Sequence, residues 1–159
     1  MTKQTTRSAF NSDCNDPNLQ IFVAGIHSIS EWNFNAWRRN YNPSNLAGKN
    51  FSTTYIRSLL DQADCNSTHI EVGPPGNGEG QPGINDDIEL SIQPTIMKTY
   101  SIALFRGVIR LYEPDQFSFY KARKSQTHFD IIFKAEKLST DADDDPTTVY
   151  YGDVSETQP

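Results

Sequence analysis

The sequence predicts a mainly β protein: an antiparallel β-sandwich or barrel-like sheet, built from a C-terminal meander, with one α-helix packed on it. Residues 87–93, 100–112, 117–123 and 128–136 alternate between two faces or carry β-forming side chains, and short turns follow several of them. Only residues 51–64 show the apolar spacing of an amphipathic helix. Because this helix precedes the strongest strands, an all-β class with one added helix is favoured over alternating α/β.

The N-terminal third contains three expected segments. Residues 1–18 are polar and predict an extended arm. Residues 19–29, LQIFVAGIHSI, are apolar on both faces and predict a buried strand with a bulge at Gly25. Residues 30–45 space their aromatic side chains irregularly among several asparagines, which predicts an irregular segment with a short helical turn.

The helix expected at residues 51–64 has a start signal and an apolar stripe. Ser52 or Thr53 can cap its first turn. The stripe consists of Tyr55, Ile56, Leu59, Leu60 and Ala63.

The glycine- and proline-rich stretch at residues 73–83, GPPGNGEGQPG, formally contains the G-x-G-x-x-G spacing of dinucleotide-binding proteins. That motif binds phosphate only when a strand precedes the glycines and a helix begins after them. Here the expected helix comes before the glycines and a strand follows, so we expect a long connecting loop. Loops of this length are often functional or form contacts, and this one is a candidate for ordering against a neighbouring subunit.

The segment at residues 100–112 is expected to be a long strand with one apolar and one mixed face. The mixed face places Arg106 and Arg110 between aliphatic side chains. A solvated sheet face is normally polar throughout, so this face is expected to meet the helix, a second sheet or another subunit.

Charge is unevenly distributed along the chain. The formal net charge is −6, which disfavours nucleic acid as the main partner. Residues 97–137 carry eight basic and four acidic side chains, whereas residues 138–159 carry six acidic and no basic ones. We therefore divide the chain into an arm (1–18), a single β-rich domain (19–137) and an acidic C-terminal tail (138–159).

The two cysteines, Cys14 and Cys65, leave their pairing open. No apolar signal region is seen at the N-terminus, and isolated thiols in such a chain are more often reduced. No apolar run approaches the ~20 residues that span a membrane, so no membrane partner is expected.

No metal or cofactor is expected from the sequence. Asp141, Asp143 and Asp145 match the first ligand positions of a calcium loop, but Pro146 and Gly152 replace its essential glycine and glutamate. No nucleophile elbow or metalloprotease motif is present, so no catalytic residues are assigned.

These observations favour a non-enzymatic structural protein that assembles with itself, as virion, tail-tube or capsid-like subunits do, made in the cytoplasm and located in the particle. Other particle proteins are further candidate partners. A basic sheet and an acidic tail on one chain can meet head to tail between copies. The candidate interface residues are Arg106, Arg110, Lys121, Arg123, Lys124, Asp141, Asp143, Asp144 and Asp145.

Two alternatives remain. The first is a carbohydrate- or ligand-binding, lectin-like β-sandwich, in which Glu31, Trp32 and Trp37 would contact the ligand. The second is a small enzyme whose site is dispersed in the sequence.

Overall fold

The protein is a mixed α/β fold with two open antiparallel sheets and, among the described residues, four helices. The computed structural model describes residues 14–44, 48–73, 87–95, 100–141 and 143–155. The larger sheet has the order β1 (Lys49–Ser52), β4 (Gln116–Arg123), β5 (Phe129–Lys137) and β6 (Thr147–Asp153). The smaller sheet is the hairpin of β2 (Thr68–Gly73) and β3 (Glu89–Pro94). The expected mainly β class with a single helix is therefore wrong in its helix content.

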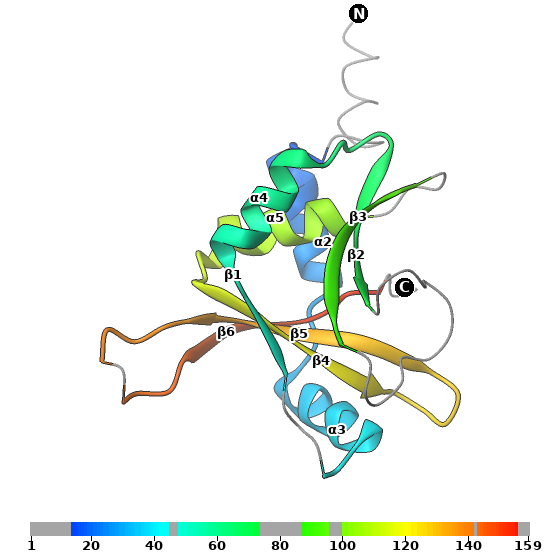
Figure 1. Cartoon of the computed structure of the whole chain (residues 1–159), viewed down its shortest axis with the longest axis vertical. Helices are drawn as coiled ribbons and strands as arrows, with labels where there is room; N and C mark the ends of the chain where they lie inside the picture. The colour runs from blue at the N-terminus through cyan, green and yellow to red at the C-terminus, as the bar shows by residue number, and fades with distance from the viewer. Residues whose placement is uncertain (1–13, 45–47, 74–86, 96–99, 142, 156–159) are drawn as a thin grey trace, which may run out of the picture.

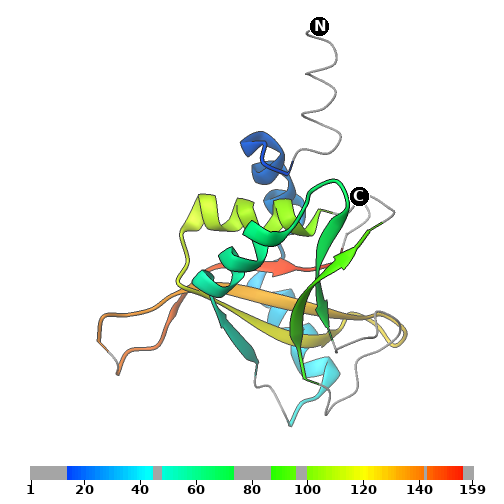
Figure 2. The same cartoon turned by 45° about the horizontal axis from the view of Figure 1, so that its top comes forward.

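Helices cover both faces of the larger sheet (Figure 1). Helices α2 (Pro17–Ile26), α4 (Thr53–Gln62) and α5 (Ser101–Tyr112) lie on one face, and α3 (Glu31–Tyr41) lies on the other, as Figure 2 also shows. Alternate residues of β4 and β5 point toward the two helical layers, because successive side chains of a strand point to opposite faces of the sheet. Phe117, Phe119 and Phe133 enter the core under α2, α4 and α5, whereas Tyr120 and Ile132 pack against Phe34 of α3.

The segment expected as a buried strand at residues 19–29 forms α2 instead. Asp16 caps this helix by accepting a hydrogen bond from the Asn18 amide (3.0 Å), and Pro17 occupies the first turn. Asp followed by Pro is a helix-start signal, which the sequence interpretation missed. The buried positions Gln20, Val23 and Ala24 recur at helical spacing.

The segment expected as a long strand at residues 100–112 forms α5. Its buried residues run almost without interruption from Ile102 to Ile109, so apolar periodicity cannot distinguish a strand from a buried helix. The spacing of Arg106 and Arg110 by four positions agrees with one helix face. Glu113 caps the C-terminus of the helix in the left-handed conformation. Its φ of 49° is the only positive φ at a non-glycine residue in the described ranges.

The remaining elements show a mixture of confirmed and wrong predictions. The helix at 51–64 is confirmed as α4, with Ser52 capping the Tyr55 amide at 3.1 Å, although its first residues belong to β1. Residues 30–45 contain a regular helix, α3, capped by Ser30. The strands at 117–123 and 128–136 are confirmed as β4 and β5, and the strand at 87–93 lies in the separate hairpin.

The acidic C-terminal segment is not only a tail. Residues 147–153 form β6, which pairs with β5 at the edge of the larger sheet. Alternation in TTVYYGD was available as a strand signal but was outweighed by the surrounding acidic residues. The arm up to residue 13 and most of the glycine-rich loop, residues 74–83, lie outside the described residues.

Candidate functional sites

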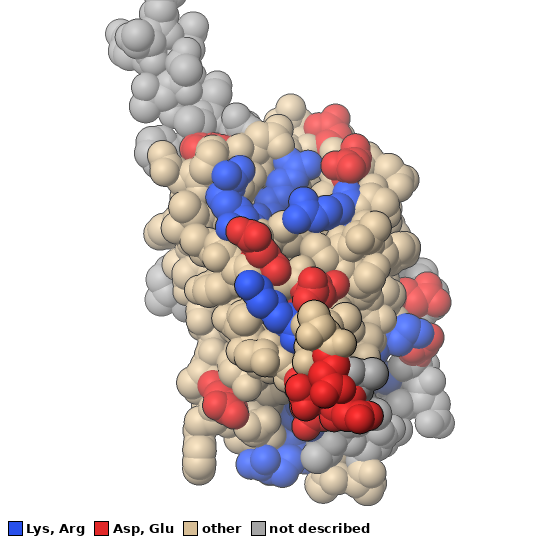
Figure 3. Space-filling view, turned by 90° about the vertical axis from the view of Figure 1, so that its left-hand side faces the viewer, with Lys and Arg blue, Asp and Glu red and all other residues tan. Residues whose placement is uncertain are grey.

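A cavity of about 540 Å³ lies where α2, α4 and α5 meet. Arg106 and Arg110 come from adjacent turns of α5, and Arg57 comes from α4. We call this cavity the arginine pocket; its remaining lining is Asn15, Gln20, Leu60, Asp61, Ile109 and Glu113. Figure 3 views this side of the molecule, on which Lys and Arg side chains gather in the upper half.

Neutral acceptors hold two of the three guanidinium groups in place. Arg106 donates to the Leu60 carbonyl oxygen (3.0 Å) and to the Asn15 side chain. Arg110 donates from Nε to Gln20 Oε1 (2.8 Å). Gln20, only 2% exposed, donates in turn to the Cys14 carbonyl oxygen (2.7 Å). The pocket wall is thus a connected network of hydrogen bonds.

Among the described residues, no carboxylate lies within ion-pair distance of the guanidinium groups of the arginine pocket. The ion pairs formed among the described residues involve Lys49, Lys124 and Lys134, and none involves an arginine. Asp61 and Glu113 line the pocket without pairing with the guanidinium groups. The expectation that Arg106 and Arg110 lie on a sheet face is wrong, because they project from a helix into this cavity.

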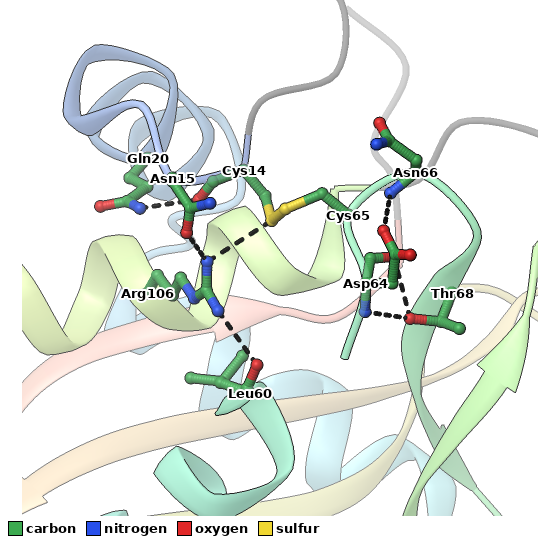
Figure 4. The surroundings of a disulfide bond; sticks show 9 residues. All are labelled: Cys14, Asn15, Gln20, Leu60, Asp64, Cys65, Asn66, Thr68 and Arg106. Atoms are coloured by element: carbon green, nitrogen blue, oxygen red, sulfur yellow. Dashed lines mark hydrogen bonds between the residues drawn. A yellow bond between two sulfur atoms is a disulfide. The ribbon is translucent and has the colours of Figure 1, made fainter. Parts of the chain in front are cut away.

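A disulfide joins Cys14 to Cys65 beside the pocket (Figure 4). The bond connects Cys14, three positions before the start of α2, to the turn after α4, with the two Cα atoms 5.6 Å apart. Arg106 Nη1 lies 3.6 Å from Cys14 Sγ. The sequence left this pairing open and favoured reduced thiols, whereas the structure joins the two cysteines across 51 positions. Helices α2 and α4 both contact α5, which brings Cys14 and Cys65 together.

A second candidate surface is the outer face of α2. Ile21, Phe22 and Ile26 are 44%, 62% and 41% exposed, and Gly25 lies among them. We call these four residues the α2 outer face. Helix α2 contains no charged residue along its whole length. Exposed apolar surface of this kind commonly marks an interaction site.

The basic residues at the end of β4 make contacts within the chain. Lys124 pairs with Asp153 and with Asp130 (3.3 Å), and its Nζ lies 5.1 Å from the Trp37 ring centroid. Arg123 stacks over Phe129 at 4.8 Å. The Lys124 charge is therefore neutralised internally. Lys121 is half-buried on the same strand.

Burial dominates the titration of the ion cluster around Lys124. Burial and, after it, the neighbouring Asp130 raise the pKa of Asp153 to about 7, whereas Lys124 opposes the shift. Burial alone would lower the pKa of Lys124, but hydrogen bonds and charge from Asp153 and Asp130 raise it overall. Sequence reasoning missed this cluster because its members come from β4, β5 and β6.

The predicted acidic residues lie on the connection between β5 and β6. Asp141, Asp143, Asp144 and Asp145 are all exposed, and Asp141 accepts a hydrogen bond from the Asp143 amide (3.0 Å). This loop and the Lys124 cluster lie at opposite ends of the sheet, as the β4–β5–β6 register requires. Among the described residues, no group of three or more His, Cys, Asp or Glu side chains is arranged to hold a metal.

The two tryptophans of the lectin-like interpretation do not share one surface. Trp32 is 79% exposed, whereas Trp37 is half-buried against Lys124. Five positions on a helix turn the side chains about 140° apart. Glu31 is exposed at the start of α3.

Sequence reasoning missed Arg57, Asp61 and Gln20. Arg57 and Asp61 are four positions apart on the polar side of the predicted helix, which was a usable signal. Their convergence with Arg106 and Arg110 depends on α5 being a helix, so it was not visible in the sequence.

Comparison with known proteins gives no match to a family model, a curated protein or a solved structure. None of the helices in the described part of the chain has the length and apolar character needed to cross a membrane. The functional argument therefore depends on the sites themselves.

Proposed function

We propose that this protein is a non-enzymatic subunit that associates with copies of itself through the α2 outer face. The observation that carries the proposal is the exposure of Ile21, Phe22 and Ile26 on a helix without charged residues. Burying such side chains is favourable, at roughly 25 cal/mol per Å² of apolar area. The core of a protein interface is typically apolar and depleted in charge.

A second copy of the chain is the partner that fits this face. Each copy carries a formal charge of −6, so two copies repel each other least when they meet through surfaces that carry no charge. The α2 outer face meets this condition, and a two-fold contact brings the same apolar surface from both copies. Phe22, at 62% exposure, would lie near the centre of such a contact.

Assembly into a larger particle, such as a virion, tail tube or capsid-like shell, requires a second and different contact. A two-fold contact alone closes at a dimer, whereas a head-to-tail contact continues into rings or filaments. The acidic residues Asp141 and Asp143–Asp145 are candidates for that contact, because they are exposed on a projecting loop (Figure 1).

The test compares two matched substitutions by light scattering and sedimentation over a range of protein concentrations. Phe22→Asp places a charge in the α2 outer face and should give a monomer. Trp32→Asp changes a residue that is also exposed, at 79%, but lies on α3 on the other face of the sheet, and should leave the mass unchanged. Circular dichroism should show that both variants remain folded.

A wild-type protein that stays monomeric at a concentration of about 1 mM would contradict self-association, since a Kd of about 1 mM is already a weak affinity. An oligomer that persists in Phe22→Asp would show that the copies meet elsewhere. The lectin-like alternative is not proposed, because Trp32 and Trp37 face different directions.

A further inference from the structure

We propose that the arginine pocket binds a small organic anion that carries phosphate or carboxylate groups together with hydroxyl groups. The proposal is independent of self-association. A cavity of about 540 Å³ is within the range of small-molecule sites, which is roughly 300–1,000 Å³.

The arginine pocket carries a net positive charge. Arg57, Arg106 and Arg110 come together in one concavity, and none forms an ion pair with a carboxylate among the described residues. Asp61 and Glu113 in the same lining offset two of the three positive charges, so the pocket keeps a formal net charge of +1, which favours an anion. A bound anion would balance this remaining positive charge.

The second argument is the hydrogen-bonding capacity that remains. Arg106 uses its terminal nitrogens on Leu60 and Asn15, and it contributes mainly its charge to the pocket. Among the described residues, Arg110 is held through Nε alone, which leaves both terminal nitrogens for a ligand. Arg57 is exposed at the pocket and forms no hydrogen bond with the described residues. Planar guanidinium groups match the oxygens of phosphate and carboxylate.

The other residues that line the pocket restrict the chemical class of ligand that fits it. Asp61 and Glu113 can accept hydrogen bonds from hydroxyl groups, and their charge opposes a long polyanion such as a nucleic acid. Leu60 and Ile109 add apolar surface against which a carbon skeleton can pack. A compact molecule with one or two anionic groups and several hydroxyls satisfies all of these groups together.

The third argument is preorganisation. Gln20 is fixed between Arg110 (2.8 Å) and the Cys14 carbonyl oxygen (2.7 Å), so it is a positioning residue for Arg110. The Cys14–Cys65 disulfide, visible in Figure 4, anchors the same wall. Groups that are already oriented lose less entropy when a ligand binds, which increases affinity.

The experiment is calorimetric titration of the full-length, oxidised protein at constant ionic strength. The probes are inorganic phosphate, pyrophosphate, citrate, glucose 6-phosphate and glucose. Wild type should bind at least one anionic probe with a Kd below about 1 mM and should not bind glucose. Comparison of the phosphate probes with citrate identifies which anionic group the site prefers.

Three variants locate the site. Arg57→Ala and Arg110→Ala should each weaken binding about tenfold or more, the effect of losing a charge-assisted hydrogen bond. Arg39→Ala removes an exposed arginine from α3, on the other face of the sheet, and should change the Kd less than about twofold. Arg57 forms no hydrogen bond with the described part of the chain, so circular dichroism of Arg57→Ala should show an unchanged fold.

Two results would overturn the proposal. One is the absence of measurable binding to every anionic probe at about 10 mM, well beyond the expected affinity. The other is an equal loss of affinity in Arg39→Ala and Arg57→Ala, which would show non-specific attraction by net charge.

Discussion

At the scale of single residues, the buried ion cluster is the feature most sensitive to pH. Asp153 is fully buried, pairs with Lys124, and shares the Ser155 hydroxyl group with Asp130. The pKa of Asp153 is raised to about 7, first by burial and then by Asp130. The folded state therefore keeps a proton on Asp153 at pH values where the unfolded chain has lost it.

We expect the free energy of unfolding to fall as the pH rises from about 4 to about 7. Because the folded state binds more protons in this window, the pH dependence of stability is negative. The contribution of Asp153 is at most about 4 kcal/mol, at 1.36 kcal/mol per pKa unit. Urea unfolding at several pH values, at low protein concentration, measures it.

Asp153→Asn is the matched variant for this measurement. It keeps the shape of the side chain but cannot titrate, so the slope between pH 4 and 7 should become much smaller. An unchanged slope in Asp153→Asn would assign the pH dependence to other groups. Above pH 10, the raised pKa of Lys124 adds a separate loss of stability, because its proton is then lost first from the unfolded chain.

Gly107 is the residue on which the close approach of α2 and α5 depends. A Cβ atom at this position would lie 2.1 Å from the Gln20 carbonyl oxygen, which is backbone and cannot rotate away. Gly107→Ala should therefore lower the free energy of unfolding by about 2–3 kcal/mol, as overpacked cores do. Thermal or urea unfolding measures the loss.

Gly25→Ala, in α2, is the control for Gly107→Ala. A Cβ atom at Gly25 meets nothing within 4 Å, so alanine should stabilise the helix by about 0.5–1 kcal/mol. Equal effects of the two substitutions would argue against a tight contact between α2 and α5.

At the scale of elements, the disulfide connects the N-terminus of α2 to the end of α4. Cross-linking residues 51 positions apart restricts the unfolded chain, which predicts a stabilisation of about 3–4 kcal/mol. Reducing agent should lower the midpoint of urea unfolding in wild type. It should have no effect on the double variant Cys14→Ser, Cys65→Ser.

Thiol labelling gives an independent check of the pairing. The native protein, purified without reductant, should show no reactive thiol until it is reduced. Labelling of both cysteines in the native, unreduced protein would contradict the bond and remove the expected stabilisation.

Local sequence signals predicted some elements well and others badly. The helix at 51–64 and the strands at 117–123 and 128–136 have clear periodicity, and the structure confirms them. Residues 101–112 are buried on nearly all sides, so strand and helix patterns fit equally and the strand assignment was wrong. Asp16-Pro17 and Ser30 were capping signals that would have identified α2 and α3.

At the scale of the whole molecule, the net charge opposes self-association, whereas the α2 outer face favours it. Two copies with a formal charge of −6 each repel, whereas the exposed apolar side chains favour contact. Added salt screens repulsion over a Debye length of about 10 Å at 0.1 M. We therefore expect self-association to become tighter between about 0.02 and 0.5 M NaCl, by sedimentation equilibrium.

The opposite salt dependence would have a specific meaning. If salt dissociates the oligomer, opposite charges hold the copies together, as expected for a head-to-tail contact between the acidic and basic segments. Replacing Asp143, Asp144 and Asp145 with Asn would then weaken association. Under the apolar-face proposal, the same triple variant should form the two-fold α2 contact at least as tightly as wild type, and only assembly beyond the dimer should be weakened.

The sequence by itself determined the local and compositional properties of this protein: the acidic net charge, the amphipathic helix, the β4–β5 hairpin and the acidic stretch at residues 141–145. These depend on residues close together in the chain. Only the tertiary structure decided that residues 101–112 form a helix, that Cys14 meets Cys65, and that Arg57 joins Arg106 and Arg110 in one pocket. Each of these depends on packing between distant segments, and local periodicity contains no information about which segments meet.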